Sequence, residues 1–103
     1  MKEKKSFLKQ KIDFESPNKN IVPITTSIGS DGKLSIGGCS IEELVKKYDS
    51  PLYILDEITL RNSCRAYKKA LEKYYPGDSL PIYASKANSS IFMSNLVSSE
   101  GFG

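Results

Sequence analysis

Lys86 is the residue of this sequence whose position best suits covalent chemistry. It follows a predicted strand over residues 80–84 and precedes a predicted helix, and catalytic groups collect at that edge of parallel α/β sheets and barrels. Among apolar neighbours such as Tyr83 and Ala87, its amine would lose solvation and become available, uncharged, for imine formation with a carbonyl. Position alone also allows a solvated loop lysine, because the chain holds 15 lysines and arginines.

The amino-acid composition excludes several other kinds of catalytic and metal-binding site. Histidine is absent, which excludes His-based catalytic triads and His-ligated metal sites. The two cysteines, Cys39 and Cys64, form no CxxC motif, and Cys64 lies on the apolar face of a predicted helix, where we interpret it as core. We therefore predict no metal site, and the low cysteine content favours a reducing, cytoplasmic location.

The charge of the chain is concentrated at its N-terminus. The formal net charge is +3, and residues 1–11 contain five lysines against one glutamate. No arginine or aromatic interleaving supports nucleic-acid recognition there, so we predict a flexible basic arm over residues 1–20 and no nucleic-acid partner. The sequence has no apolar run of membrane-spanning length, so we predict no membrane association.

A β-hairpin and a short helix are predicted over residues 21–50. β-branched residues flank the turn Gly29-Ser30-Asp31-Gly32, which predicts a hairpin over residues 21–36 that ends at Gly37-Gly38. Ser40 and Glu43 then have the spacing of a capping box at the start of an amphipathic helix.

Residues 51–103 show a β-α-β-α order. An apolar strand is predicted over 52–55, and Asp56 is placed to cap a helix over 57–75. A second strand over 80–84 and a helix over 89–99 follow, with Asn88 as the expected cap. This order predicts an α/β fold, either a (β/α) barrel or a doubly wound sheet.

Several strings of the sequence, in order, resemble those of the pyridoxal-phosphate-dependent decarboxylases of the ornithine/diaminopimelate/arginine group. The segment Tyr83-Ala84-Ser85-Lys86-Ala87-Asn88 is similar to the family's YAxKAN motif. The strings GCSIEEL, SPLYILDE followed by LR, CRAY, YPG and EGFG also occur in family order and spacing. The resemblance covers residues 33–103. It implies that residues 51–103 are the first two β-α units of a (β/α)8, TIM-like barrel, and that the preceding hairpin joins a C-terminal β-domain.

The resemblance also implies a function. Lys86 would form the internal aldimine with pyridoxal 5′-phosphate, and Ala84, two residues earlier on the same strand, would point the same way and leave room for the cofactor ring. The implied reaction is decarboxylation of a small amino acid, meso-2,6-diaminopimelate, to L-lysine by a homodimer. Alternatives remain: a group member acting on ornithine, arginine or carboxynorspermidine, a non-catalytic truncated product, or a barrel that binds the cofactor without decarboxylating. We expect the 103-residue chain by itself to be inactive.

Overall fold

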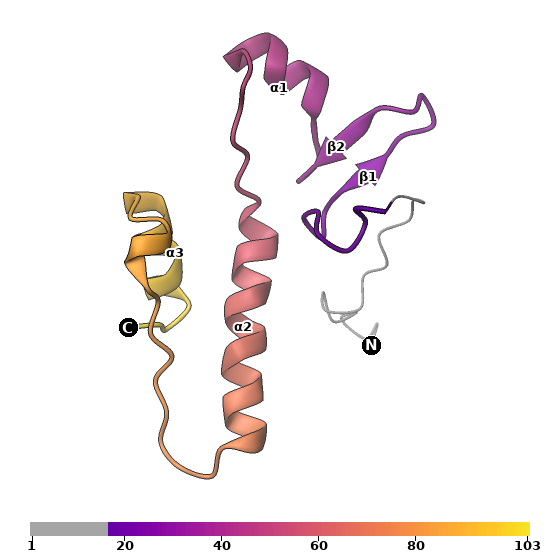
Figure 1. The fold of residues 1–103 in the computed structure, drawn as a ribbon. Helices are drawn as coiled ribbons and strands as arrows, with labels where there is room; N and C mark the ends of the chain where they lie inside the picture. Colours follow the sequence, from indigo (N-terminus) through magenta and orange to yellow (C-terminus); the bar gives the residue numbers. More distant parts are fainter. Residues whose placement is uncertain (1–16) are drawn as a thin grey trace. The chain divides into compact units, whose positions relative to one another are not determined.

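The computed structural model describes residues 17–103, so the predicted basic arm lies largely outside the described residues. The chain divides into two compact units, residues 1–60 and residues 61–103. Figure 1 traces the elements along the chain. In the described part of the chain, no helix is both long enough and apolar enough to cross a membrane.

The first unit contains a small antiparallel sheet of order β1-β2-β3. Strands β1 (Ser27–Ile28) and β2 (Leu34–Ile36) pair across the predicted turn, with Ser27 opposite Ser35. The turn is closed by the Gly29 amide, which donates to the Lys33 carbonyl at 2.9 Å. The hairpin is shorter than predicted, because residues 21–26 form turns rather than strand.

A third strand, β3 (Cys39–Ser40), was not predicted from the sequence. It pairs antiparallel to β2, with Ile36 opposite Cys39, so Gly37-Gly38 is a second hairpin turn and not an end to the sheet. Both glycines have positive φ, 59° and 77°, which is what a two-residue type I′ turn requires.

Helix α1 (Ile41–Tyr48) begins where it was predicted to begin. The Glu43 amide donates to the Ser40 hydroxyl at 3.5 Å, which confirms Ser40 as the N-cap. Exposed Lys33 on the hairpin pairs with Glu42 on this helix, Nζ to Oε2, at 2.9 Å.

Helix α2 (Glu57–Tyr74) also matches its prediction closely. The Asp56 carboxylate accepts the Thr59 amide at 3.1 Å and the Thr59 hydroxyl as well. The same hydroxyl accepts the Ile24 amide at 3.0 Å. The Asp56 cap therefore orders the helix start and also ties the loop before β1 to it.

Loss of this cap gives a first testable prediction. Asp56→Ala should lower the free energy of unfolding by about 1 kcal/mol or somewhat more, because two donors of Thr59 lose their shared acceptor. Urea titration of the 103-residue chain measures the change, with Asp78→Ala, at an exposed loop aspartate, as the control. Equal effects of the two substitutions would contradict the capping role.

The predicted strands over 52–55 and 80–84 are not assigned as strands. In the described residues, no backbone hydrogen bond joins 52–55 to another strand, and Tyr53 is 99% exposed. Extended backbone without a hydrogen-bonded partner strand is not a β-strand, so the prediction of a strand over 52–55 is not met in the described residues.

Residues 80–84 do have one parallel-type pairing in the second unit. The Gly103 amide donates to the Pro81 carbonyl and the Tyr83 amide donates to the Gly103 carbonyl, both at 2.9 Å. These two bonds flank Ile82 and converge on Gly103, which is the pattern of a parallel ladder. Helix α3 (Ile91–Ser99) lies between the paired segments in sequence, so this stretch has the order of a β-α-β unit.

The end of α3 determines where the paired segment begins. Gly101, with φ of 84°, donates its amide to the Ser98 carbonyl, and the Phe102 amide donates to the Val97 carbonyl, both at 3.0 Å. These bonds form a Schellman motif, which ends the helix and turns the chain toward Gly103. The buried residues of this unit are Cys64 on α2 and Met93, Leu96 and Val97 on α3.

Candidate active site

Lys86 lies in a one-turn 3₁₀ helix, η2 (Ser85–Ala87), directly after the segment paired with Gly103. The turn is closed by the Ala87 amide, which donates to the Ala84 carbonyl at 3.1 Å. A second hydrogen bond spans the turn: the Tyr83 hydroxyl donates to the Asn88 carbonyl at 2.9 Å. The residues of the YAxKAN-like motif therefore build the turn that carries the lysine.

The surroundings of Lys86 differ from those predicted. Lys86 and Ala84 are both exposed, so the described residues do not provide the expected loss of solvation. Within residues 17–103, the Lys86 amine forms no hydrogen bond or ion pair. Because Lys86 is in a 3₁₀ turn and not on the strand, the alternation that would point Ala84 and Lys86 the same way does not apply.

Asn88 does not cap the next helix, contrary to the sequence prediction. Ser90 is the N-cap of α3, and its hydroxyl accepts the Met93 amide at 3.2 Å. Asn88 acts two residues earlier, where its Oδ1 accepts the Ser90 amide at 3.0 Å. This side-chain turn links the end of η2 to the start of α3.

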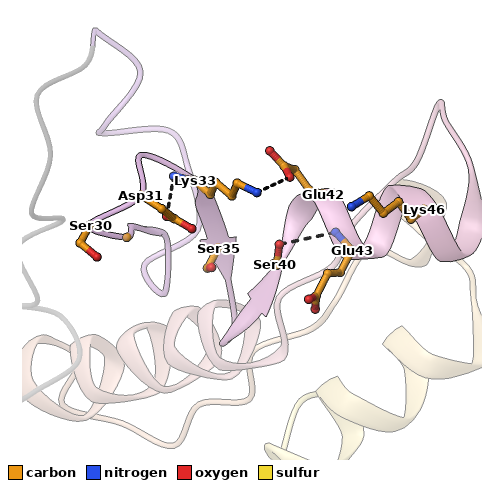
Figure 2. Close-up of a pocket in the computed structure, with 9 residues that line it drawn as sticks. Ser30, Asp31, Lys33, Ser35, Ser40, Glu42, Glu43 and Lys46 are labelled. Atoms are coloured by element: carbon orange, nitrogen blue, oxygen red, sulfur yellow. Dashed lines mark hydrogen bonds and ion pairs between the residues drawn. The ribbon is translucent and has the colours of Figure 1, made fainter.

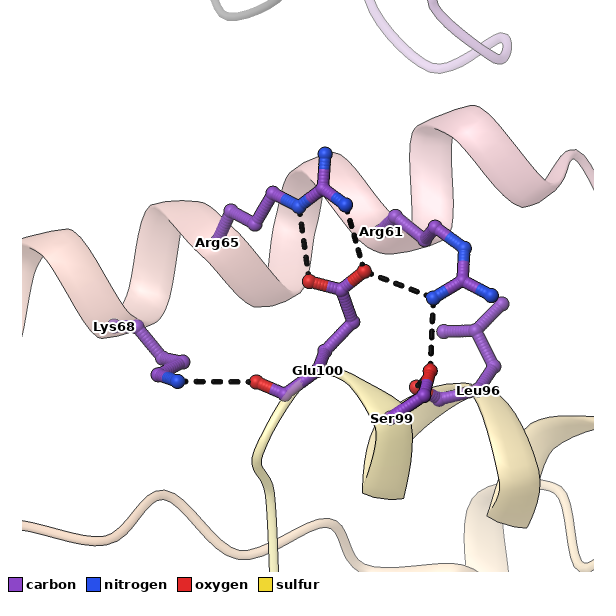
Figure 3. Close-up of polar contacts among 6 residues, drawn as sticks. All are labelled: Arg61, Arg65, Lys68, Leu96, Ser99 and Glu100. Carbon is purple, nitrogen blue, oxygen red and sulfur yellow. Dashed lines mark hydrogen bonds and ion pairs between the residues drawn. The ribbon is translucent and has the colours of Figure 1, made fainter.

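The sequence did not predict a cluster of charged side chains around Glu100, which Figure 3 shows. Arg65 binds the Glu100 carboxylate through Nε and Nη2, both at 2.9 Å, and Arg61 Nη1 binds Oε1 at 2.8 Å. Lys68 Nζ donates to the Glu100 carbonyl at 3.2 Å. The Glu100 side chain is only 9% exposed, so these cations compensate a nearly buried charge.

The arginines lower the pKa of the Glu100 carboxyl below its ordinary range. Hydrogen bonds from Arg65 and then Arg61 are the main causes, and they outweigh the burial, which acts in the opposite direction. A signal in the sequence for this cluster would have been the spacing of Arg61, Arg65 and Lys68, which places all three cations on one side of α2.

This lowered pKa predicts a pH dependence of stability. The contribution of the ionised Glu100 carboxylate to the free energy of unfolding is fully present above the ordinary glutamate pKa of about 4.3. It is lost as the pH falls through the lower pKa that Glu100 has in the folded state. The free energy of unfolding should therefore fall over that acidic window, and Glu100→Gln should remove this part of the fall. Urea titrations from pH 6 to pH 2 measure it, with Glu72→Gln, at an exposed position on α2, as the control. An unchanged acid profile in Glu100→Gln would contradict the assignment.

The two cysteines are both free thiols in different surroundings. Cys64 is buried, as predicted. Its burial is the main cause of a raised pKa of the thiol, and the negative charge of Glu100 is the second, so Cys64 is unsuited to act as a thiolate nucleophile. Cys39 is exposed. No group of three potential metal-ligating side chains comes together among residues 17–103.

A polar pocket in the first unit lies between the hairpin and α1 (Figure 2). Lys33, Glu42, Glu43 and Lys46 line it together with small polar residues of the turn. Lys33 and Glu42 neutralise each other by their ion pair, and the pocket contains neither Lys86 nor Ala84. Asp31 also lines the pocket, so three carboxylates face two lysines there.

The known proteins to which this chain is similar in sequence share one name, diaminopimelate decarboxylase. Diaminopimelate decarboxylase of a Synechocystis species is 48% identical over 88 residues, which is 85% of this chain and 19% of the relative. The diaminopimelate decarboxylases of Bacillus methanolicus and Archaeoglobus fulgidus are 37% identical over 78 residues and 34% identical over 74 residues. These alignments cover 75% and 72% of this chain but 18% and 16% of the relatives. The chain thus spans less than a fifth of their length.

The other two comparisons are negative. No protein-family model matches the chain, and no solved structure gives a significant match.

Proposed function

We propose that this chain is part of a diaminopimelate decarboxylase, to which it is similar over most of its own length, and that it supplies the cofactor-bearing lysine of that carboxy-lyase. The proposed reaction removes CO2 from meso-2,6-diaminopimelate to give L-lysine, and the proposed cofactor is pyridoxal 5′-phosphate. One observation carries the proposal: Lys86 is exposed in a turn that directly follows a segment paired in parallel fashion with Gly103.

The residues near Lys86 are compatible with covalent attachment of this cofactor. Lys86 is exposed, and exposed Ala84 carries only a methyl side chain. Within residues 17–103 we assign no group to the cofactor phosphate. Lys86 and Ala84 are therefore the cofactor-binding residues that we propose for this chain.

The chain's own chemical contribution follows from the Lys86 amine. Pyridoxal 5′-phosphate, when bound, supplies the electron sink for the carbanion left by departing CO2. Lys86 Nζ would hold the cofactor until the amine of the substrate takes the place of Nζ on the cofactor. The freed amine is then placed to return a proton or to release the product.

The proposed larger fold is a (β/α)8 barrel, in which residues 51–103 form the first two β-α units. The parallel-type pairing beside Ile82 and the helix order α2, then α3, support this arrangement. We further propose that the hairpin of β1 and β2 joins a C-terminal β-domain, and that the enzyme is a cytoplasmic homodimer. The shared name of the relatives favours diaminopimelate over ornithine, arginine or carboxynorspermidine as substrate.

A labelling experiment tests the proposal. In a chimera, this sequence replaces the matching stretch of the Synechocystis decarboxylase, to which it is 48% identical. Borohydride reduction in the presence of cofactor should fix a pyridoxyl group on Lys86, as read by peptide mass spectrometry. Exposed Lys69 on α2 is the internal control for non-specific reaction with free cofactor, and at one equivalent of cofactor its label should stay far below that on Lys86. Label on another lysine instead of Lys86 would refute the assignment.

A further inference from the structure

Tyr83 forms one hydrogen bond through its backbone, to Gly103, and another through its side chain, to the end of the Lys86 turn. Its amide donates to the Gly103 carbonyl at 2.9 Å, which anchors it in the parallel pairing. Its hydroxyl, on a half-buried side chain, donates to the Asn88 carbonyl at 2.9 Å, on the far side of η2. Tyr83 is thus hydrogen-bonded to Gly103 through its backbone and to Asn88, which follows the turn that carries Lys86, through its side chain.

The remaining bonds of the turn show why this side-chain contact matters. Within η2, the Ala87 amide to the Ala84 carbonyl, at 3.1 Å, is the bond that closes the 3₁₀ turn. A single 3₁₀ turn is weak by itself, because its hydrogen-bond geometry is poor and it fixes several backbone angles for one bond. The Tyr83 hydroxyl adds a second closure that spans residues 83–88, with Lys86 between its ends.

We propose that Tyr83 is the positioning residue for Lys86. Its hydroxyl holds the turn in the conformation that presents the Lys86 amine, and it does so without touching the reacting atoms. The inference rests on the proposed function only where it concerns cofactor attachment, because the ordering of the turn stands independently of any ligand. Pre-organised presentation of a nucleophile lowers the entropic cost of its reaction.

Amide hydrogen exchange of the 103-residue chain tests the ordering directly. Tyr83→Phe removes the hydroxyl and keeps the ring, so exchange at Ala87 should become about three- to tenfold faster, the range expected for one hydrogen bond. Exchange within α2 and α3 should be unchanged. Tyr67→Phe is the matched control, because Tyr67 lies on α2 and is 68% exposed. An Ala87 amide that is unprotected in the unsubstituted chain, or unaffected by Tyr83→Phe, would overturn the inference.

Cofactor attachment provides the second readout. In the Synechocystis chimera, the rate at which added pyridoxal 5′-phosphate is fixed on Lys86 by borohydride should fall severalfold with Tyr83→Phe and stay unchanged with Tyr67→Phe. Equal rates in all three proteins would overturn the positioning role. Failure of the proposed function looks different: Lys86 would remain unlabelled in every variant, while the exchange at Ala87 would still decide whether Tyr83 orders the turn.

Discussion

Replacing Lys86 by alanine should abolish decarboxylation and leave the fold in place. In the Synechocystis chimera, we expect Lys86→Ala to lower kcat for diaminopimelate by a factor on the order of 10³ or more, as for other residues that react covalently. Lys86 is exposed and its amine forms no hydrogen bond within the described residues, so its replacement should change the free energy of unfolding by less than about 0.5 kcal/mol. Carbon dioxide release measures the activity, and urea titration measures the stability.

Two further variants separate charge from covalent chemistry. Lys86→Arg keeps the positive charge but stays protonated and cannot form an imine, so it should be as inactive as Lys86→Ala. Lys69→Ala removes an exposed lysine from α2 and should leave kcat unchanged. Appreciable activity in Lys86→Arg would show that Lys86 contributes only its charge and would refute its proposed role.

The 103-residue chain alone should release no CO2 from diaminopimelate above the rate of free cofactor. Catalysis requires the cofactor phosphate to be held and the scissile bond to be aligned, and we assign no residue of 17–103 to either task. The chain also spans only 19% of its Synechocystis relative. The assay uses purified chain with cofactor, and a yellow adduct is not counted, because free cofactor also reacts with exposed lysines.

Mixing provides the positive control for this assay. The Synechocystis decarboxylase without its matching stretch should be inactive alone and should gain activity when this chain is added. Chain carrying Lys86→Ala should fail to restore that activity. CO2 release by the chain alone would show that the residues present here are sufficient, and would contradict the expectation.

Local interactions explain why the helices could be predicted from the sequence. Ser40 caps α1 through the amide of Glu43, and Asp56 caps α2 through the amide of Thr59, each only three residues away. Such contacts are specified by residue type and spacing within one turn. The turn between β1 and β2 was predictable for the same reason, whereas Gly37-Gly38 is compatible with either an end or a type I′ hairpin.

The tertiary structure decided the contacts between distant residues. Glu100 binds Arg61 and Arg65, which are 39 and 35 residues away, and the spacing that places both arginines on one side of α2 does not identify their partner. Their pairing required the end of α3 to lie against α2, and residue spacing within either helix alone does not specify that approach.

Some features of the candidate site were likewise predictable from the sequence, and others were visible only in the tertiary structure. The sequence determined that Lys86 lies in a YAxKAN-like segment between an extended run and a helix, because those features are local. Only the tertiary structure showed that Gly103 pairs beside Ile82, that the lysine is exposed, and that the Tyr83 hydroxyl reaches the Asn88 carbonyl. Each of these depends on which backbone and side-chain groups fold back on one another, a free-energy balance that residue type and periodicity do not encode.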